Sequence, residues 1–264
     1  MGHNVVFYFT STGNSLFVSR KIAAAIGECD VISIPNFKDR ELKYGYERIG
    51  FVFPIYALGT PRLVRNFLKD MNFANNGRGY YFAVATYGGK GEGGVFNEVH
   101  TLLKSNGAAL NAGFKVKMVH NYVVRHSLTE DGVRESLEQA QGDIDYIAES
   151  VKEKSLTDIP DENPFGMSHI YAIRSFMRLD RQFVISENCE GCGLCAKVCP
   201  ATNIKIADGR PVFDGRCEHC LACLHICPNS CMDYQDKTQN KMRYRHPEIT
   251  VEDLIQCVNG YSLT

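Results

Sequence analysis

The stretch FYFTSTGNSLF, residues 7–17, places six small polar residues, Thr10–Ser15, between two apolar segments. A simple turn needs only two or three such residues, and here a helical pattern begins inside them. A strand that leads directly into a helix directs backbone N–H groups and hydroxyls to the positive end of that helix. Such an end binds anions, and a terminal phosphate group is its natural occupant. The alternative is a polar turn with an N-cap, for which Thr12 or Asn14 alone would suffice.

Strand-like and helix-like segments alternate around and beyond this stretch. Apolar, strand-like runs lie at residues 4–9, 29–34, 48–56, 79–87 and 114–119, with helical patterns between them and after the last. Strands that are apolar on both faces and separated by helix-length crossovers indicate a parallel sheet covered on both sides. Five such units in about 155 residues fit the flavodoxin-like order. We therefore expect an α/β fold, with a doubly wound parallel sheet of five strands in the order 2-1-3-4-5.

The composition excludes several functional classes. With 29 Lys and Arg against 30 Asp and Glu, the chain has no basic stripe of the kind that nucleic-acid binding requires. No apolar run is long enough to span a bilayer, and VVFYF (residues 5–9) is too short for the core of a signal peptide. We therefore expect a cytoplasmic protein without nucleic-acid or membrane partners. Its 11 cysteines are more than chance would give. Disulfides are rare in the cytoplasm, so these cysteines are not expected to form them.

Two cysteine motifs account for most of these cysteines. CEGCGLCAKVCP (residues 189–200) and CEHCLACLHICP (residues 217–228) share the pattern C-x₂-C-x₂-C-x₃-C-P, and 217 − 189 gives an offset of 28 that holds throughout. This spacing matches the bacterial ferredoxin run that holds two [4Fe–4S] clusters. The alternative is a pair of structural zinc sites, but zinc usually takes two ligand pairs separated by a longer loop. Between the motifs, IKIADGRPVF (residues 204–213) predicts a hairpin that turns at Asp208–Gly209.

The resemblance to two-cluster ferredoxins implies that the fourth ligands are exchanged between the motifs. The first cluster would then use Cys189, Cys192, Cys195 and Cys227, and the second would use Cys217, Cys220, Cys223 and Cys199. Cys231 is the plausible stand-in ligand, whereas Cys29 and Cys257 are expected to be free thiols. Because the cysteine count is complete, His219 and His225 are expected to pack near the clusters rather than bind them.

The stretch Thr10–Ser15 also resembles the phosphate loop of flavodoxins, whose pattern is S/T-x-T-G-x-S/T. By that match the side chains of Thr10, Thr12, Asn14 and Ser15 would bind the phosphate of FMN, and Ser11 and Gly13 would contribute backbone N–H groups. The loops after the third and fourth strands should touch the flavin ring. They supply Pro54, Ile55, Tyr56, Ala57, Leu58 and Gly59, and Thr86, Tyr87, Gly88, Gly89 and Gly94. Flavodoxins often stack a Trp and a Tyr on the ring. This chain has no Trp, and Tyr56 and Tyr87 could instead be half-buried core residues.

The whole chain resembles the flavodoxin–ferredoxin fusions of anaerobes, the "ferrodoxin"-type family. The resemblance implies a flavodoxin-like FMN-binding domain at residues 1–155, a linker with a crossing helix at 156–179, and a small α+β ferredoxin-like domain with two [4Fe–4S] clusters at 180–235. A C-terminal tail with a short helix follows at 236–264.

These features predict an electron-transfer protein that couples FMN to two [4Fe–4S] clusters. It would exchange electrons with a ferredoxin pool or with a larger redox enzyme. Two alternatives are an FMN-dependent reductase of a small substrate fed through the clusters, and a redox sensor. If the protein is an enzyme, it is a flavin and iron–sulfur oxidoreductase. The sequence shows no paired carboxylates and no nucleophile with a base, so no catalytic residue is assigned, and a homodimer is left open.

Overall fold

The computed structural model describes residues 3–42, 45–89, 94–159 and 178–259. Its first part is a parallel sheet in the order β2-β1-β3-β4-β5, which confirms the predicted flavodoxin-like topology. The strands are β1 (His3–Tyr8), β2 (Cys29–Ser33), β3 (Tyr46–Pro54), β4 (Tyr80–Tyr87) and β5 (Ala112–Lys117). The order reverses between β1 and β3, and ligands of such folds bind at the carboxyl ends of the strands near this switch point.

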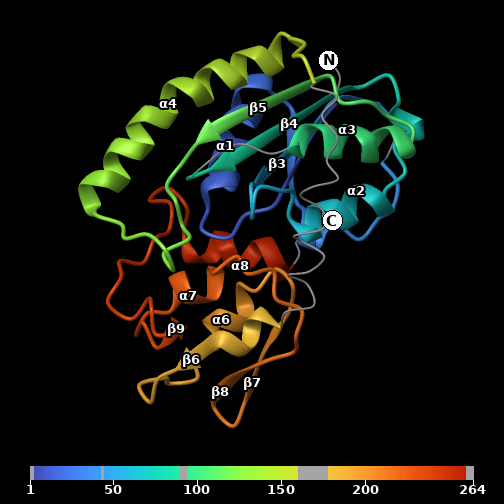
Figure 1. Ribbon diagram of the computed structural model, residues 1–264. Coiled ribbons are helices and arrows are strands. Elements are labelled where there is room, and N and C mark those ends of the chain that lie inside the picture. The colour runs from blue at the N-terminus through green and yellow to red at the C-terminus, as the bar shows by residue number, and fades with distance from the viewer. Residues whose placement is uncertain (1–2, 43–44, 90–93, 160–177, 260–264) are drawn as a thin grey trace.

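Helices cover both faces of this sheet (Figure 1). One face packs against α1 (Asn14–Ile26) and α4 (Glu130–Lys152), and the other packs against α2 (Arg62–Asp70) and α3 (Val95–Ser105). The short 3₁₀ turns η1 (Ile34–Asn36) and η2 (Ala74–Asn76) lie in the connections. Alternate residues of β1 supply the two cores, since Val6 faces α1 and α4 while Phe7 faces α2 and α3.

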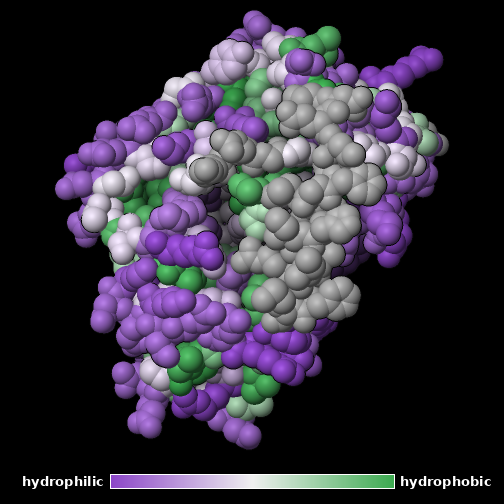
Figure 2. Space-filling model, viewed as in Figure 1, coloured by the Kyte–Doolittle hydropathy of each residue, from purple (hydrophilic) through white to green (hydrophobic). Residues whose placement is uncertain are grey.

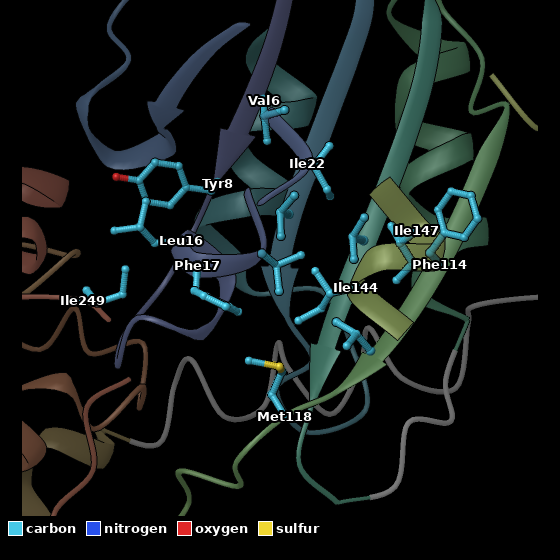
Figure 3. Close-up of a cluster of buried hydrophobic side chains, with 14 of the residues drawn as sticks. Val6, Tyr8, Leu16, Phe17, Ile22, Phe114, Met118, Ile144, Ile147 and Ile249 are labelled. Atoms are coloured by element: carbon cyan, nitrogen blue, oxygen red, sulfur yellow. The ribbon is translucent and has the colours of Figure 1, made fainter. Parts of the chain in front are cut away.

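The helix α4 illustrates how a stripe of apolar residues on one face determines the packing of a helix on the sheet. Thr129 caps its N-terminus, where the Thr129 hydroxyl accepts a hydrogen bond from the Gly132 N–H at 3.1 Å. Ile144 and Ile147 are buried against Phe114 of β5 and Ile22 of α1 (Figure 3). The outer surface of α4 is hydrophilic (Figure 2), as expected of a helix that buries one apolar stripe.

The cysteine-rich part is built from short elements. An antiparallel pair joins β6 (Phe183–Ile185) to β9 (Met232–Tyr234), and a hairpin joins β7 (Ile204–Ala207) to β8 (Arg210–Phe213). The 3₁₀ turn η3 (Leu179–Gln182) and the helices α6 (Leu194–Lys197) and α7 (Ala222–Ile226) complete it. The hairpin turns at Asp208 and Gly209 as predicted, with φ values of 48° and 70°. Positive φ at both central residues is the signature of a tight hairpin turn.

The chain then returns to the first part. The helix α8 (Val251–Asn259) lies between the sheet and the cysteine-rich part (Figure 1). Thr250 caps this helix, because the Thr250 hydroxyl accepts from the Asp253 N–H at 3.0 Å. Cys257 then contacts Tyr8, whose hydroxyl lies 3.1 Å from the Cys257 Sγ. The C-terminal segment therefore connects the two parts rather than extending away from them.

The predicted domain boundaries stay predictions. The predicted crossing helix falls largely at residues 160–177, outside the described part of the chain. In the described ranges, we find no helix with both the length and the apolar character that crossing a membrane requires.

Candidate functional site

A cavity of about 850 Å³ lies at the carboxyl ends of the sheet strands. Residues that directly follow β1, β3, β4 and β5 contribute to its walls. The predicted FMN-site residues that line it are Thr10, Ser11, Thr12, Asn14, Ser15, Pro54, Ile55, Tyr56, Ala57, Leu58, Thr86, Tyr87, Gly88 and Gly89. Three predicted residues do not line it: Gly13, Gly59 and Gly94. A cavity of this size can hold a large cofactor.

Gly13 has a different role from the rest of its loop. Its φ of 100° is left-handed, and a Cβ placed on it would lie 2.9 Å from the Cβ of Ile249 and 3.1 Å from the Cβ of His246. The His246 N–H also donates to the Thr12 carbonyl at 2.8 Å. Glycine is therefore required here because the C-terminal segment packs directly on the back of the loop.

The side chains of the loop are buried and hydrogen-bonded. The Thr10 hydroxyl accepts from the Gly13 N–H at 3.1 Å, and the Ser15 and Thr86 hydroxyls lie 3.0 Å apart. The Asn14 side chain donates to the Val119 carbonyl at 3.1 Å and accepts from the Tyr244 hydroxyl at 2.6 Å. These bonds hold the loop in one conformation at the N-terminus of α1.

The loop after β3 turns back sharply on itself. Ala57 and Leu58 have φ values of 47° and 65°, and a backbone pairing joins Tyr56 to Gly59. Gly59 thus shapes the turn without lining the cavity. The turn directs the Tyr56 hydroxyl to the Ser11 Oγ at 3.0 Å, so Tyr56 contacts the phosphate loop as well as the cavity.

The loop after β5, residues 118–129, forms a wall that the sequence did not predict. Its cavity-lining residues are Met118, Val119, His120, Asn121, Tyr122, Arg125 and His126. A Cβ on Gly88 would lie 2.3 Å from the Cα of His120, so this loop packs tightly on the loop after β4. Burial lowers the pKa of His120 to about 4, which keeps its imidazole neutral at pH 7.

The second cysteine motif forms the opposite wall. Cys217, Glu218, His219, Cys220 and Leu221 all line the same cavity as the phosphate loop. Glu218 is buried, and its carboxylate accepts from Arg62 Nε of α2 at 2.7 Å. Burial raises the pKa of Glu218 although Arg62 opposes the shift. This ion pair joins the cysteine motif to the first part of the chain at the edge of the cavity.

The eight motif cysteines border two further small cavities. One is lined by Cys189, Cys192, Cys195 and Cys227, with Cys231 beside them; the other is lined by Cys199, Cys217, Cys220 and Cys223. No three His, Cys, Asp or Glu side chains of the described residues converge on one point as a single metal ion requires. The cysteines of each set line a small cavity together with apolar neighbours.

The protonation chemistry of these cysteines suits iron ligation. Burial raises the pKa of Cys217 to about 12 and that of Cys220 and Cys223 well above the ordinary thiol value. A buried thiolate therefore needs a cation in contact with it, and metal ligation supplies one. Cys29, on β2, and Cys257, on α8, border neither of the two small cavities.

The two motifs repeat each other in backbone conformation as well as in spacing. Left-handed residues occur at equivalent positions, offset by 28: Gly191 and His219, Gly193 and Leu221, Thr202 and Ser230. The fourth cysteines also match, since Cys199 Sγ accepts from the Asn203 N–H at 3.3 Å and Cys227 Sγ accepts from the Cys231 N–H at 3.2 Å. Hydrogen bonds to cluster sulfurs are one of the means by which proteins set cluster potentials.

Comparison with known proteins agrees with this duplication. Residues 181–228 match the family model of the 4Fe-4S dicluster domain. This segment, the dicluster segment, contains both motifs and the hairpin between them. The predicted resemblance to flavodoxin–ferredoxin fusions is therefore confirmed, with a flavodoxin-like sheet in the first part and an iron–sulfur segment in the second. No curated protein matches the chain.

The solved structures similar to the first part include flavodoxins. Megasphaera elsdenii flavodoxin is 16% identical, with coverage of 53% of this chain and 98% of its own and a TM-score of 0.33. A short-chain flavodoxin associated with a non-canonical PDU bacterial microcompartment is 15% identical, with coverage of 55% and 99% and a TM-score of 0.35. Rubredoxin oxygen:oxidoreductase of Desulfovibrio gigas is 16% identical, with coverage of 58% and 37% and a TM-score of 0.39. At these low values, the flavodoxin-like assignment rests on the strand order of the sheet.

Proposed function

We propose that this protein transfers electrons between FMN, bound in the large cavity, and two [4Fe–4S] clusters in the dicluster segment. One observation carries the proposal: the phosphate-loop residues and the cysteines Cys217 and Cys220 line the same cavity. A flavin held by the loop would thus lie beside the ligands of one cluster. FMN exchanges one or two electrons and each cluster exchanges one, so their combination links two-electron and one-electron carriers.

The residues present fit both parts of FMN, the phosphate group and the flavin ring. At the phosphate end, Ser11, Thr12 and Asn14 offer hydroxyl and amide groups at the N-terminus of a helix, where an anion is stabilised. For the ring, the same cavity offers Tyr87, Gly88 and Leu221 in its lining. The protein's part is to orient the ring toward the dicluster segment and to keep water from it.

The grouping of cysteines supports the exchanged ligand sets. Cys227 borders the space with the first three cysteines of the first motif, and Cys199 borders the space with those of the second. In the proposal, the cluster held by Cys217, Cys220, Cys223 and Cys199 is the one next to the flavin. The other cluster lies by Cys192, which is exposed, and therefore serves as the point of exchange with a redox partner protein.

An FMN-dependent reductase is the second candidate function, and the loop after β5 favours it. This loop adds Arg125 and His126, both exposed, and the neutral His120 to the rim of the cavity. Steady-state turnover with a panel of small acceptors separates the two functions. Turnover of a small molecule that depends on Arg125 would establish the reductase, and transfer confined to redox proteins would establish the carrier.

Anaerobic purification with assays for iron, sulfide and flavin tests the proposed function as a whole. We expect about eight iron atoms, about eight sulfides and about one FMN per chain, with a brown visible spectrum. Stoichiometric zinc in place of iron, or a protein that retains no flavin after loading with FMN, would overturn it.

Exposure to air is expected to destroy the cluster near Cys192 first, because that cysteine is open to solvent whereas Cys220 and Cys223 are buried. We predict that the brown colour bleaches and iron is released while the first domain stays folded. Iron content and far-UV circular dichroism, followed together after oxygen is admitted, measure both events. Full iron content after prolonged exposure would contradict the prediction.

Arg243 is expected to raise the reduction potential of the clusters. Its Nη2 donates to the Met232 carbonyl at 2.9 Å, and its Nε and Nη1 are buried without a hydrogen-bond partner among the described residues. The guanidinium interacts electrostatically with Cys223 and Cys227, one cysteine of each set. A nearby cation stabilises the reduced, more negative cluster.

Arg243→Gln should therefore lower a cluster potential by on the order of 50 mV in an electrochemical titration. Arg48→Gln is the matched control, because Arg48 also donates to backbone carbonyls but does so in the first domain, to Val151 and Lys152. Equal potentials in the Arg243 variant and the wild type would show that the guanidinium does not act on the clusters.

A further inference from the structure

A hydrogen-bond network connects the second cysteine motif to the phosphate loop. His225 lies on α7, between Cys223 and Cys227. Its Nδ1 accepts from the Tyr244 N–H at 3.1 Å, and its Nε2 lies 2.7 Å from the Asn121 carbonyl. Since a backbone N–H can only donate, Nδ1 is the acceptor and Nε2 carries the proton that Asn121 accepts.

Both partners of His225 continue to the phosphate loop. The Tyr244 hydroxyl donates to Asn14 Oδ1 at 2.6 Å, and the Asn121 side chain donates to Ser11 Oγ at 2.9 Å and to Thr12 Oγ1 at 3.4 Å. Two separate routes, one through each partner, therefore run from a single histidine of the cysteine motif to the loop.

The network determines which donors the loop offers to a ligand. Ser11 Oγ accepts from both Asn121 and Tyr56, which fills the two acceptor positions of a hydroxyl and leaves its O–H to donate. Asn14 has its oxygen occupied by Tyr244 and one N–H occupied by the Val119 carbonyl, which fixes the orientation of the amide. One N–H of Asn14 remains, and both residues line the cavity. Donors fixed in this way favour an anion with several acceptor oxygens.

We propose that Tyr244 and Asn121, held by His225, are positioning residues that give the phosphate loop its affinity for the phosphate group of FMN. The inference rests on the proposed binding of FMN and adds to it a dependence on the dicluster segment. The dicluster segment thereby contributes to binding of the phosphate group through His225, which does not itself line the cavity.

The test compares FMN with riboflavin, which has the same ring and no phosphate. Anaerobic protein with full iron content and its flavin removed by dialysis is titrated with each flavin, and binding is followed by flavin fluorescence. Tyr244→Phe should weaken FMN about tenfold, which corresponds to about one hydrogen bond, and leave riboflavin affinity unchanged. Asn121→Ala should act in the same direction through the other route.

Tyr234→Phe is the matched control. The Tyr234 hydroxyl also donates to a side-chain amide oxygen, that of Gln182 at 2.7 Å, but neither of these two residues lines the cavity. This variant should bind both flavins as the wild type does. Unchanged FMN affinity in both the Tyr244 and the Asn121 variant would overturn the inference, as would an equal loss for both flavins.

The relative affinity of the wild type for FMN and riboflavin distinguishes a failure of this inference from a failure of the proposed function on which it rests. A wild type that binds riboflavin as tightly as FMN would overturn the phosphate site and the inference together. A wild type that prefers FMN, with Tyr244→Phe and Asn121→Ala both retaining that preference, would overturn the inference alone.

Discussion

Replacing Cys199 by alanine is expected to remove the same cluster as replacing Cys217, although the two residues belong to different motifs. Both border the same small cavity with Cys220 and Cys223. In the exchanged arrangement each single variant loses one cluster, and iron falls from about eight to about four atoms per chain. Cys29→Ala is the control, because Cys29, on β2, borders neither of the two small cavities, and this variant should keep its full iron content.

Double variants decide which cysteines share a cluster. Cys199→Ala with Cys217→Ala should retain about four iron atoms, because both changes affect one cluster. Cys199→Ala with Cys189→Ala should retain almost none, because the changes affect both clusters. The opposite result would show that each motif ligates its own cluster: the double variant at Cys189 and Cys199 would retain about four iron atoms, and the double variant at Cys199 and Cys217 would retain almost none.

Replacing Thr12 by valine and Asn14 by leucine is expected to abolish FMN retention and leave the iron content unchanged. Both side chains line the cavity at the N-terminus of α1. A hydrogen bond to a charged group contributes about 1.5–3 kcal/mol, so the loss of two corresponds to at least a hundredfold weaker binding. The change at Asn14 also removes the acceptor of the Tyr244 hydroxyl, which adds to the loss.

A control with the same chemical changes lies on α3. Asn97→Leu with Thr101→Val removes a side-chain hydrogen bond of 3.2 Å at a distance from the cavity lining. This variant should retain FMN. Flavin occupancy in the Thr12 and Asn14 variant equal to that of the wild type would refute the assignment of the phosphate loop.

The sheet and its helices could be predicted because the spacing of apolar residues within each short segment indicates a strand or a helix. The apolar runs at residues 29–34 and 79–87 predict β2 (Cys29–Ser33) and β4 (Tyr80–Tyr87) to within one residue at each end, and the strand order follows from the crossovers. The cysteine spacing carries comparable information, because ligation requires those residues at those separations.

The other walls of the cavity, and the hydrogen bonds that hold the phosphate loop, could not be predicted because they depend on contacts between distant parts of the chain. Asn121 and Tyr244 are ordinary polar residues in irregular segments, and only the folded chain brings them to Ser11 and Asn14. The sequence around Leu221 does not indicate that this residue lines the cavity either. Its left-handed backbone becomes interpretable only through Gly193, its equivalent in the first motif.

The rate of electron transfer between the clusters and the flavin within one chain tests the central claim most directly. The clusters of FMN-loaded protein are reduced rapidly under anaerobic conditions, and flavin absorbance is followed at several protein concentrations. Because Cys217 and Cys220 line the cavity proposed to bind FMN, we predict a rate constant that does not depend on protein concentration. A rate that rises in proportion to protein concentration would contradict the account, because the electrons would then pass between molecules.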